Sequence, residues 1–145
     1  MTESPNISLD DPYVRHAGTR PTDVGAERAA VEQDGHELDN HVGVRHASAL
    51  YTGAYGAARA LVVRALGDRA DTVSICHQRS EITYSNIPVG PIVSGARRRD
   101  PDRWDEAAAS LDAGRPAEVA TDVVSTNEQG RTVVTLESHW RVEPR

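Results

Sequence analysis

The spacing of hydrophobic residues predicts one long helix followed by a series of strands. Between about residues 45 and 66, apolar side chains recur at steps of three and four, which is the period of a helix face. Leu50, Ala54 and Leu61 belong to this stripe. Gly53 and Gly56 interrupt it, although glycine costs up to about 1 kcal/mol relative to alanine inside a helix. We therefore expect another part of the protein to pack closely against the middle of this helix.

After residue 70 the period changes to two, which indicates strands. In Asp71–Tyr84 the alternation slips between His77 and Ile82, so we expect a bulge or strong bend there. The predicted elements that follow are a strand at Pro91–Arg98, a helical piece at Pro101–Leu111 and strands at Glu118–Ser125 and Thr132–Val142, the last two joined by a hairpin turn at Asn127–Gly130. A run of hairpin-connected strands gives an antiparallel sheet.

The N-terminal part is more polar. We expect a flexible tail over residues 1–20 and a short amphipathic helix over Asp23–Gln33, capped by Thr22. Residues 21–145 then form a single domain. The predicted fold class is α+β, with the sheet wrapped around the one long helix, because a single apolar helix must bury its stripe against a sheet face.

Composition narrows the class of protein further. The net charge of −6 argues against a nucleic-acid surface, which is normally basic. The single cysteine, Cys76, excludes an internal disulfide framework and fits a reducing compartment. No uncharged apolar run is long enough to span a membrane. We expect a soluble, cytoplasmic protein that binds neither nucleic acid nor membrane.

Polar side chains are concentrated where the long helix begins, at Asn40, His41, Arg45, His46 and Ser48. A helix N-terminus has unpaired N–H groups and partial positive charge, so it suits an anion or a polarised carbonyl.

The segment Asn40-x-x-Gly43-x-x-His46-Ala47-Ser48 resembles the entrance to the central helix of hotdog-fold acyl-thioester enzymes, in particular the PaaI-like thioesterases. Ile82-Thr-Tyr84 with its Pro88 and Gly90 turn, and the closing strands, are also similar to that family. The resemblance covers roughly residues 38–143 and implies a hotdog fold that is at least dimeric.

The resemblance also implies roles for individual residues. Asn40 stands where the family has Asn or Gln, and His46 with the Ala47 N–H would polarise the thioester carbonyl. Gly43 and Ser48 would complete this part of the substrate site. The family's catalytic acid falls nine residues after the histidine, and Tyr55 occupies that position here.

Several interpretations of these residues remain open. Tyr55 could donate a hydrogen bond to substrate or simply close the pocket, since a phenol is a weak base at neutral pH. Asp39 or Glu37 could supply the missing carboxylate, or Asp39 could be a helix cap or surface acid. His46 could be a functional donor or a structural histidine bonded to a backbone carbonyl.

Five further residues have polar or ionisable side chains of interest. The resemblance implies that Ser74 faces the partner subunit's site. Arg97 and Arg99 share one strand face and could grip a phosphate-bearing group, or form a solvated edge. Cys76 and His77 are not expected to act as a pair, because neighbours on a strand point to opposite faces.

The resemblance implies a thioesterase-like enzyme that acts on an acyl thioester of coenzyme A or an acyl carrier protein, in a biosynthetic setting. No separate cofactor or metal is expected, since coenzyme A or phosphopantetheine belongs to the substrate. The assembly would be a homodimer or homotetramer. The missing acid leaves two alternatives: a dehydratase, isomerase or cyclase on the same fold, or a non-catalytic acyl-thioester binding or scaffold protein.

Overall fold

The computed structural model describes residues 14, 18–34, 38–41 and 43–145 of the chain. The elements in chain order are the strands β1 (Thr19–Val24) and β2 (Arg28–Gln33), the helix α2 (Ala47–Leu66), the 3-10 turn η2 (Gly67–Thr72), the strands β3 (Val73–Tyr84) and β4 (Ile92–Arg99), the helix α3 (Pro101–Asp112) and the strands β5 (Ala117–Thr126) and β6 (Thr132–Pro144). The predicted strands, helical piece and long helix are all present.

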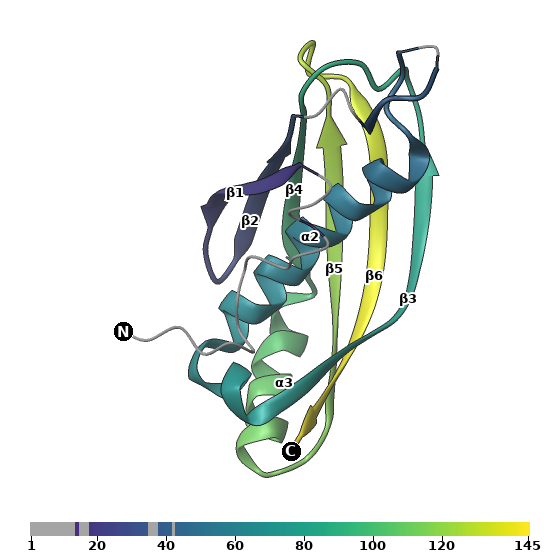
Figure 1. The fold of residues 1–145 in the computed structure, drawn as a ribbon. Helices are drawn as coiled ribbons and strands as arrows, with labels where there is room; N and C mark the ends of the chain where they lie inside the picture. Colours follow the sequence, from purple (N-terminus) through teal and green to yellow (C-terminus); the bar gives the residue numbers. More distant parts are fainter. Residues whose placement is uncertain (1–13, 15–17, 35–37, 42) are drawn as a thin grey trace.

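The six strands form one antiparallel sheet in the order β1-β2-β4-β5-β6-β3. Figure 1 shows α2 running diagonally across one face of this sheet, with α3 beside the lower end of β5. Most residues of α2 are buried, and the stripe residues Ala54 and Leu61 are completely inaccessible. The predicted arrangement of a sheet wrapped around one central helix is confirmed.

The predicted helix over Asp23–Gln33 is wrong. Two strands, β1 and β2, occupy this region and turn at Gly25, whose N–H donates to the Arg28 carbonyl at 2.9 Å. Ala29, Val31 and Gln33 are buried at alternate positions of β2, and β2 pairs along its length with β4. Helix propensity is a weak preference that burial of one strand face overrides. The predicted tail falls mainly outside the described residues, and Thr19 and Arg20 belong to β1.

The predicted bulge in β3 is confirmed. The register shifts between His77, opposite Trp140, and Arg79, opposite His139. In a regular strand Arg79, two residues after His77, would lie on the same face as His77, the face that meets α2. The bulge turns Arg79 outward and places Ser80 inward instead, opposite Ser138.

Among the described residues, none of the helices has the length and apolar character needed to span a membrane.

Candidate active site

The loop before α2 is a turn built on Asn40 and Gly43. The Asn40 N–H donates to the Val44 carbonyl at 2.7 Å, and the Asn40 side-chain oxygen accepts from the Val44 N–H at 3.2 Å. Gly43, at φ +76°, donates to the Asn40 carbonyl at 3.0 Å. Both residues therefore shape the chain just before the helix, and this geometry accounts for their spacing.

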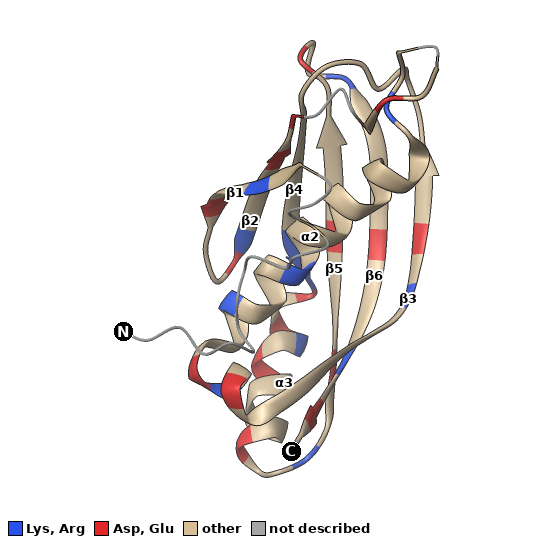
Figure 2. Cartoon of the chain, in the orientation of Figure 1, with Lys and Arg blue, Asp and Glu red and all other residues tan. Residues whose placement is uncertain are grey.

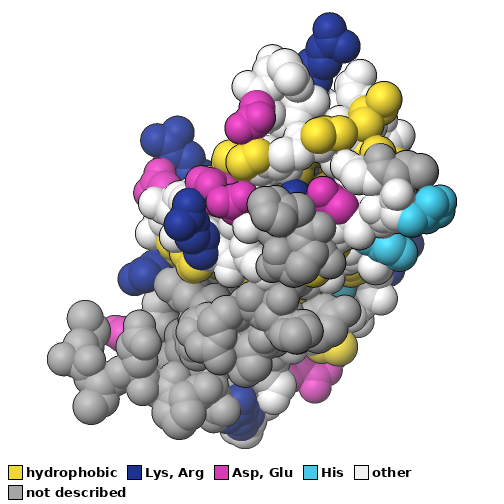
Figure 3. All heavy atoms as spheres, turned by 45° about the horizontal axis from the view of Figure 1, so that its top comes forward, with side chains coloured by type: hydrophobic (Ala, Val, Ile, Leu, Met, Phe, Trp, Pro, Cys, Tyr) yellow, Lys and Arg dark blue, Asp and Glu magenta, His cyan; other side chains and the backbone are white. Residues whose placement is uncertain are grey.

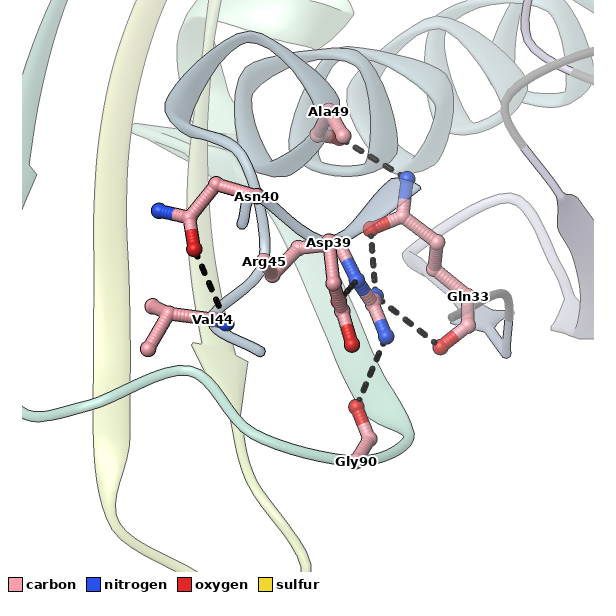
Figure 4. A network of polar contacts seen from close by, with 7 residues as sticks. All are labelled: Gln33, Asp39, Asn40, Val44, Arg45, Ala49 and Gly90. Atoms are coloured by element: carbon pink, nitrogen blue, oxygen red, sulfur yellow. Dashed lines mark hydrogen bonds and ion pairs between the residues drawn. The ribbon is translucent and has the colours of Figure 1, made fainter. Parts of the chain in front are cut away.

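A buried arginine fixes this loop to the rest of the fold (Figure 4). Arg45 is 3% exposed, and its guanidinium donates to the Asp39 carboxylate, the Gln33 side chain and the Gly90 carbonyl, each at 2.9 Å. Gln33 in turn donates to the Ala49 carbonyl of α2 at 2.8 Å. We call Arg45, Asp39 and Gln33 the arginine clamp. It ties together β2, the first turn of α2 and the loop that leads into β4.

Within the clamp, Arg45 holds the side chain of Asp39 in place. Its carboxylate is paired with Arg45 Nε, and the two residues also form an isolated β-bridge. Asp39 is thus a structural partner of a buried cation rather than the helix cap. Glu37, the other acid considered, lies outside the described residues.

His46 is the N-cap of α2, and it lies exposed together with Ala47 and Ser48. Its Nδ1 accepts from the Ser48 N–H at 3.4 Å and lies 3.0 Å from the Ser48 hydroxyl. A backbone N–H can only donate, so in the neutral imidazole the proton is on Nε2, which remains available as a donor. The Ala47 N–H, at the first helical position, has no acceptor among the described residues. We call these residues the helix entrance.

One side of α2 is only partly covered by the sheet. Tyr51 and Tyr55 lie on this side, after the helix entrance. Their rings stack with centroids 6.5 Å apart. Tyr51 Oη lies 3.0 Å from the Ser80 hydroxyl, and Tyr84 Oη donates to the Ala47 carbonyl at 3.2 Å. The first turns of α2 are thus joined to β3 by tyrosine side chains. Figure 2 shows that α2 carries no acidic residue.

Beneath Tyr55 lies an aromatic cluster that the sequence did not reveal. The His77 ring centroid is 5.4 Å from that of Tyr55 and 4.6 Å from that of Trp140, and Tyr55 and Trp140 are 5.8 Å apart. Trp140 Nε1 donates to the Thr121 hydroxyl at 3.0 Å, which fixes the indole. Burial lowers the pKa of His77, so its imidazole is neutral at neutral pH.

Burial also raises the pKa of Tyr84, and the nearby phenol of Tyr51 adds to the effect. Both shifts favour the uncharged side chain, so neither His77 nor Tyr84 carries a charge at neutral pH. The described residues contain no group of three His, Cys, Asp or Glu side chains that could hold a metal ion.

The remaining predicted residues lie away from the helix entrance. Ser74 is exposed on the face of β3 opposite to α2. Arg99 contacts both Asp122 and Glu137, and these hydrogen bonds raise its pKa. Arg97 is exposed on the same outer face and stands opposite Asp122. The carboxylates already occupy Arg99, so the two arginines do not form an open phosphate grip.

Sequence reasoning missed Arg45 and His77. A buried arginine has no signature in the sequence when its acceptors come from residues as distant as Gly90. The position of His77 could be predicted in part. The expected bulge in β3 indicates which residues of that strand face α2, but the contact between His77 and Tyr55 depends on the angle at which α2 crosses the sheet, which the sequence does not show.

Solved structures of other proteins are similar to this structure over most of the chain. One similar solved structure is a Pseudomonas aeruginosa protein of unknown function, described as a "Probable Thioesterase", with a TM-score of 0.80 and 20% identity over 96% of this chain and 91% of that chain. A Streptococcus pneumoniae "Hypothetical Thioesterase Protein with Coenzyme A" gives 0.68 and 14% over 92% and 97%. The Escherichia coli PaaI protein gives 0.66 and 14% over 90% and 83%.

At these identities the likeness shows the fold, which is the hotdog fold. No curated protein matches the sequence. Residues 4–142 match the family described as "Domain of unknown function (DUF4442)". The chain is therefore a hotdog-fold protein, and it belongs to the DUF4442 family.

Proposed function

We propose that the protein is a thioesterase-like enzyme that holds an acyl-thioester carbonyl at the helix entrance. The observation that carries this proposal is the exposed Ala47 N–H at the first position of a 20-residue helix, next to the Nε2–H of His46. Two donors at the positive end of a helix stabilise charge that develops on a carbonyl oxygen. The thioesterase and coenzyme A descriptions of the structural neighbours agree with this assignment.

The surface around the entrance also suits a long substrate. Ile87 and Val89 are 67% and 52% exposed on the loop between β3 and β4, and the Pro88 carbonyl between them accepts from the Arg45 N–H at 2.9 Å. Figure 3 views this end of the molecule, where hydrophobic and histidine side chains share the surface. An acyl or pantetheine chain can pack on such apolar side chains, so coenzyme A and acyl carrier protein are both suitable carriers.

A second copy of the chain is part of the proposal. β3 pairs with β6 along one edge only and forms one end of the sheet order. Antiparallel pairing of β3 with its copy would place the start of one strand beside the end of the other, and so turn the helix entrance of each protomer toward the partner. The homodimer would form the site between two central helices.

Gly53, Ala54, Gly56, Ala57 and Ala58 lie outside this proposed interface. All are buried within the chain itself. Gly53 faces the Gln33 side chain, and Gly56 faces Val14 and Thr19. The partly buried Tyr51 and Tyr55 lie on the side of α2 that a partner paired with β3 can reach.

Hydrolysis is the default reaction, and dehydration, isomerisation or cyclisation of the acyl chain remain alternatives because α2 has no acid. The test is to incubate the protein with acyl-coenzyme A and acyl-carrier substrates of varied chain, and to follow free thiol and product mass. We expect turnover of at least one substrate. His46→Ala should reduce it by about 10²-fold, the effect of losing one oxyanion donor. Absence of turnover by folded protein would contradict an enzymatic role.

The absence of a carboxylate from α2 favours one second candidate, a non-catalytic acyl-thioester binding protein. In that case acyl-coenzyme A should raise the melting temperature without being consumed, since a ligand that binds only the native state stabilises it. His46→Ala would then weaken this shift and have no turnover to abolish.

A further inference from the structure

Three buried side-chain atoms have no hydrogen-bond partner among the described residues: Oγ1 of Thr19 on β1, Nε2 of His77 on β3 and Oγ of Ser138 on β6. His77 and Ser138 form a pair under α2, apart from Thr19 at the other end of the sheet. Ser138 is 1% exposed. Leaving such an atom unpaired costs about 1–3 kcal/mol, so each calls for an explanation. The two atoms belong to neighbouring strands, which makes one explanation sufficient for both.

The register places them on one patch of the inner sheet face. His77 is opposite Trp140, and Ser138 is two residues before Trp140 on β6. Residues at such diagonal positions are about 7–8 Å apart at Cα, close enough for one small molecule to bridge their side chains. Tyr55 covers the patch from α2, and the β3 bulge keeps Arg79 out of it.

The chemistry of the patch suits a water molecule that is to be deprotonated. With the proton of its neutral imidazole on Nδ1, His77 presents a lone pair at Nε2, while the Ser138 hydroxyl can orient a bound water. Of the two rings that contact His77, the Tyr55 phenol on α2 is titratable, whereas Trp140 on β6 does not ionise. In the described part of the chain no carboxylate or guanidinium shifts the pKa of His77.

We infer that His77 is the general base of this protein and takes the place of the carboxylate that α2 lacks, with Ser138 as the residue that positions the water. This inference rests on the proposed function, because it assigns the base of the same acyl-thioester site. It adds a catalytic residue on β3, outside the Asn40–Ser48 segment at the start of α2.

The reaction step balances with these groups alone. His77 Nε2 takes a proton from water while the water oxygen bonds to the thioester carbon, and the carbonyl becomes an oxyanion held by the Ala47 N–H and His46 Nε2–H. The C–S bond then breaks, and the His77 imidazolium returns the proton to the departing sulfur. The products are a carboxylic acid and a thiol.

Distance along α2 decides which protomer's His77 acts. Ala47 and Tyr55 are eight residues apart, or about 12 Å along the helix axis, too far for both to contact one carbonyl. His77 lies under Tyr55. The antiparallel pairing of β3 strands brings the entrance of one copy toward the His77 patch of the other, so each site combines the two protomers.

The first test compares His77→Gln with wild type and with His139→Gln, a matched control on the outer face of β6. We expect His77→Gln to lower kcat by about 10²-fold or more, as for loss of a general base. In wild type, kcat/KM should fall on the acid side with a midpoint below about 6.5, since His77 must be neutral. His139→Gln should keep both the rate and this acid limb.

Ser138→Ala provides a second readout. We expect it to lower kcat less than His77→Gln does, and to leave the acid side of the pH profile of kcat/KM unchanged. Near wild-type kcat and an intact acid limb in folded His77→Gln would overturn the inference while leaving the proposed function in place. Absence of any turnover by wild type would instead remove the proposed function, and this inference with it.

The second test uses a heterodimer of His77→Gln and His46→Ala chains, purified through two different tags. If each site combines two protomers, one of the two sites in the heterodimer has both an intact His46 and an intact His77. About half of the wild-type activity should then return. If His77 acts within its own chain, every site is defective and activity stays at the level of the single variants. That result would overturn the shared site.

Discussion

At the scale of single residues, Arg45 shows how the start of a helix can depend on one buried side chain. Four hydrogen bonds from one guanidinium, including a longer one of 3.5 Å to the Gln33 carbonyl, fix three segments at once. Arginine suits this position because its planar fork offers several donors in fixed directions. These hydrogen bonds position the start of α2 relative to β2 and the β3–β4 loop.

Arg45→Met should lower the free energy of unfolding by about 3–5 kcal/mol, because it leaves Asp39 and the Gly90 carbonyl without their buried partner. Urea unfolding measures this directly. Arg131→Met, at an exposed position in the β5–β6 turn, is the control and should change stability by no more than about 0.5 kcal/mol. Equal midpoints for the two variants would show that the clamp contributes little.

The same residue explains why Asp39 was ambiguous in the sequence. An aspartate shortly before a helix is favoured as a cap, and a nearby histidine suggests catalysis. Its real partner, six residues later, is recognisable only when Arg45 is seen to be buried. His46 proves to be the cap itself, a role that its Nδ1 can fill because Ser48 follows two residues later.

At the scale of elements, strong periodicity predicted structure well and weak periodicity did not. The long helix, the β3 bulge and the Asn127 hairpin all follow from local patterns: Asn127 accepts from the N–H groups of Gln129 and Arg131, and Gly130 has a φ of +74°. Residues 19–33 have no such pattern. Their strands depend on pairing with β4, some sixty residues later, which sequence period alone does not show.

The two glycines of α2 should respond oppositely to alanine. A Cβ at Gly53 would meet the Gln33 side chain at 3.5 Å, an ordinary contact, so Gly53→Ala should stabilise the protein by up to about 1 kcal/mol through helix propensity. A Cβ at Gly56 would lie 2.7 Å from a Val14 methyl. Gly56→Ala should therefore gain nothing or destabilise.

Thermal or urea unfolding of both glycine variants beside wild type gives the comparison. An equal gain in stability for the two would mean that Val14 moves aside at no cost. The contacts also specify the close packing that the sequence led us to expect, since side chains from β1, β2 and Val14 pack against the narrow part of α2.

At the scale of the whole molecule, charge forms a row across the outer sheet face. Arg97, Asp122, Glu137 and Glu81 stand at paired positions of β4, β5, β6 and β3, and Figure 2 shows the three acids side by side on their strands. Arg99 forms ion pairs with both Asp122 and Glu137. Among the described residues, Glu81 at the open edge has no ion pair, and neither has its neighbour Arg79.

A two-fold axis at Ser80 would place Arg79 of each copy opposite Glu81 of the other, and so satisfy both. Glu81→Arg should therefore weaken the homodimer about tenfold or more, because it replaces two attractive cross-strand pairs by two repulsive ones. The double variant Arg79→Glu with Glu81→Arg should restore it. Sedimentation equilibrium measures the dissociation constants; a double variant as weak as the single one would exclude this register.

The scarcity of aromatic residues gives the protein a natural optical reporter. Of its two tryptophans, Trp104 lies against Arg98, while Trp140 lies 4.6 Å from His77. A protonated imidazole quenches an excited indole by accepting an electron, whereas a neutral one does so weakly. In a Trp104→Phe background, emission would come from Trp140 alone. Its intensity would follow the protonation of His77 during a pH titration and on substrate binding, without any added label.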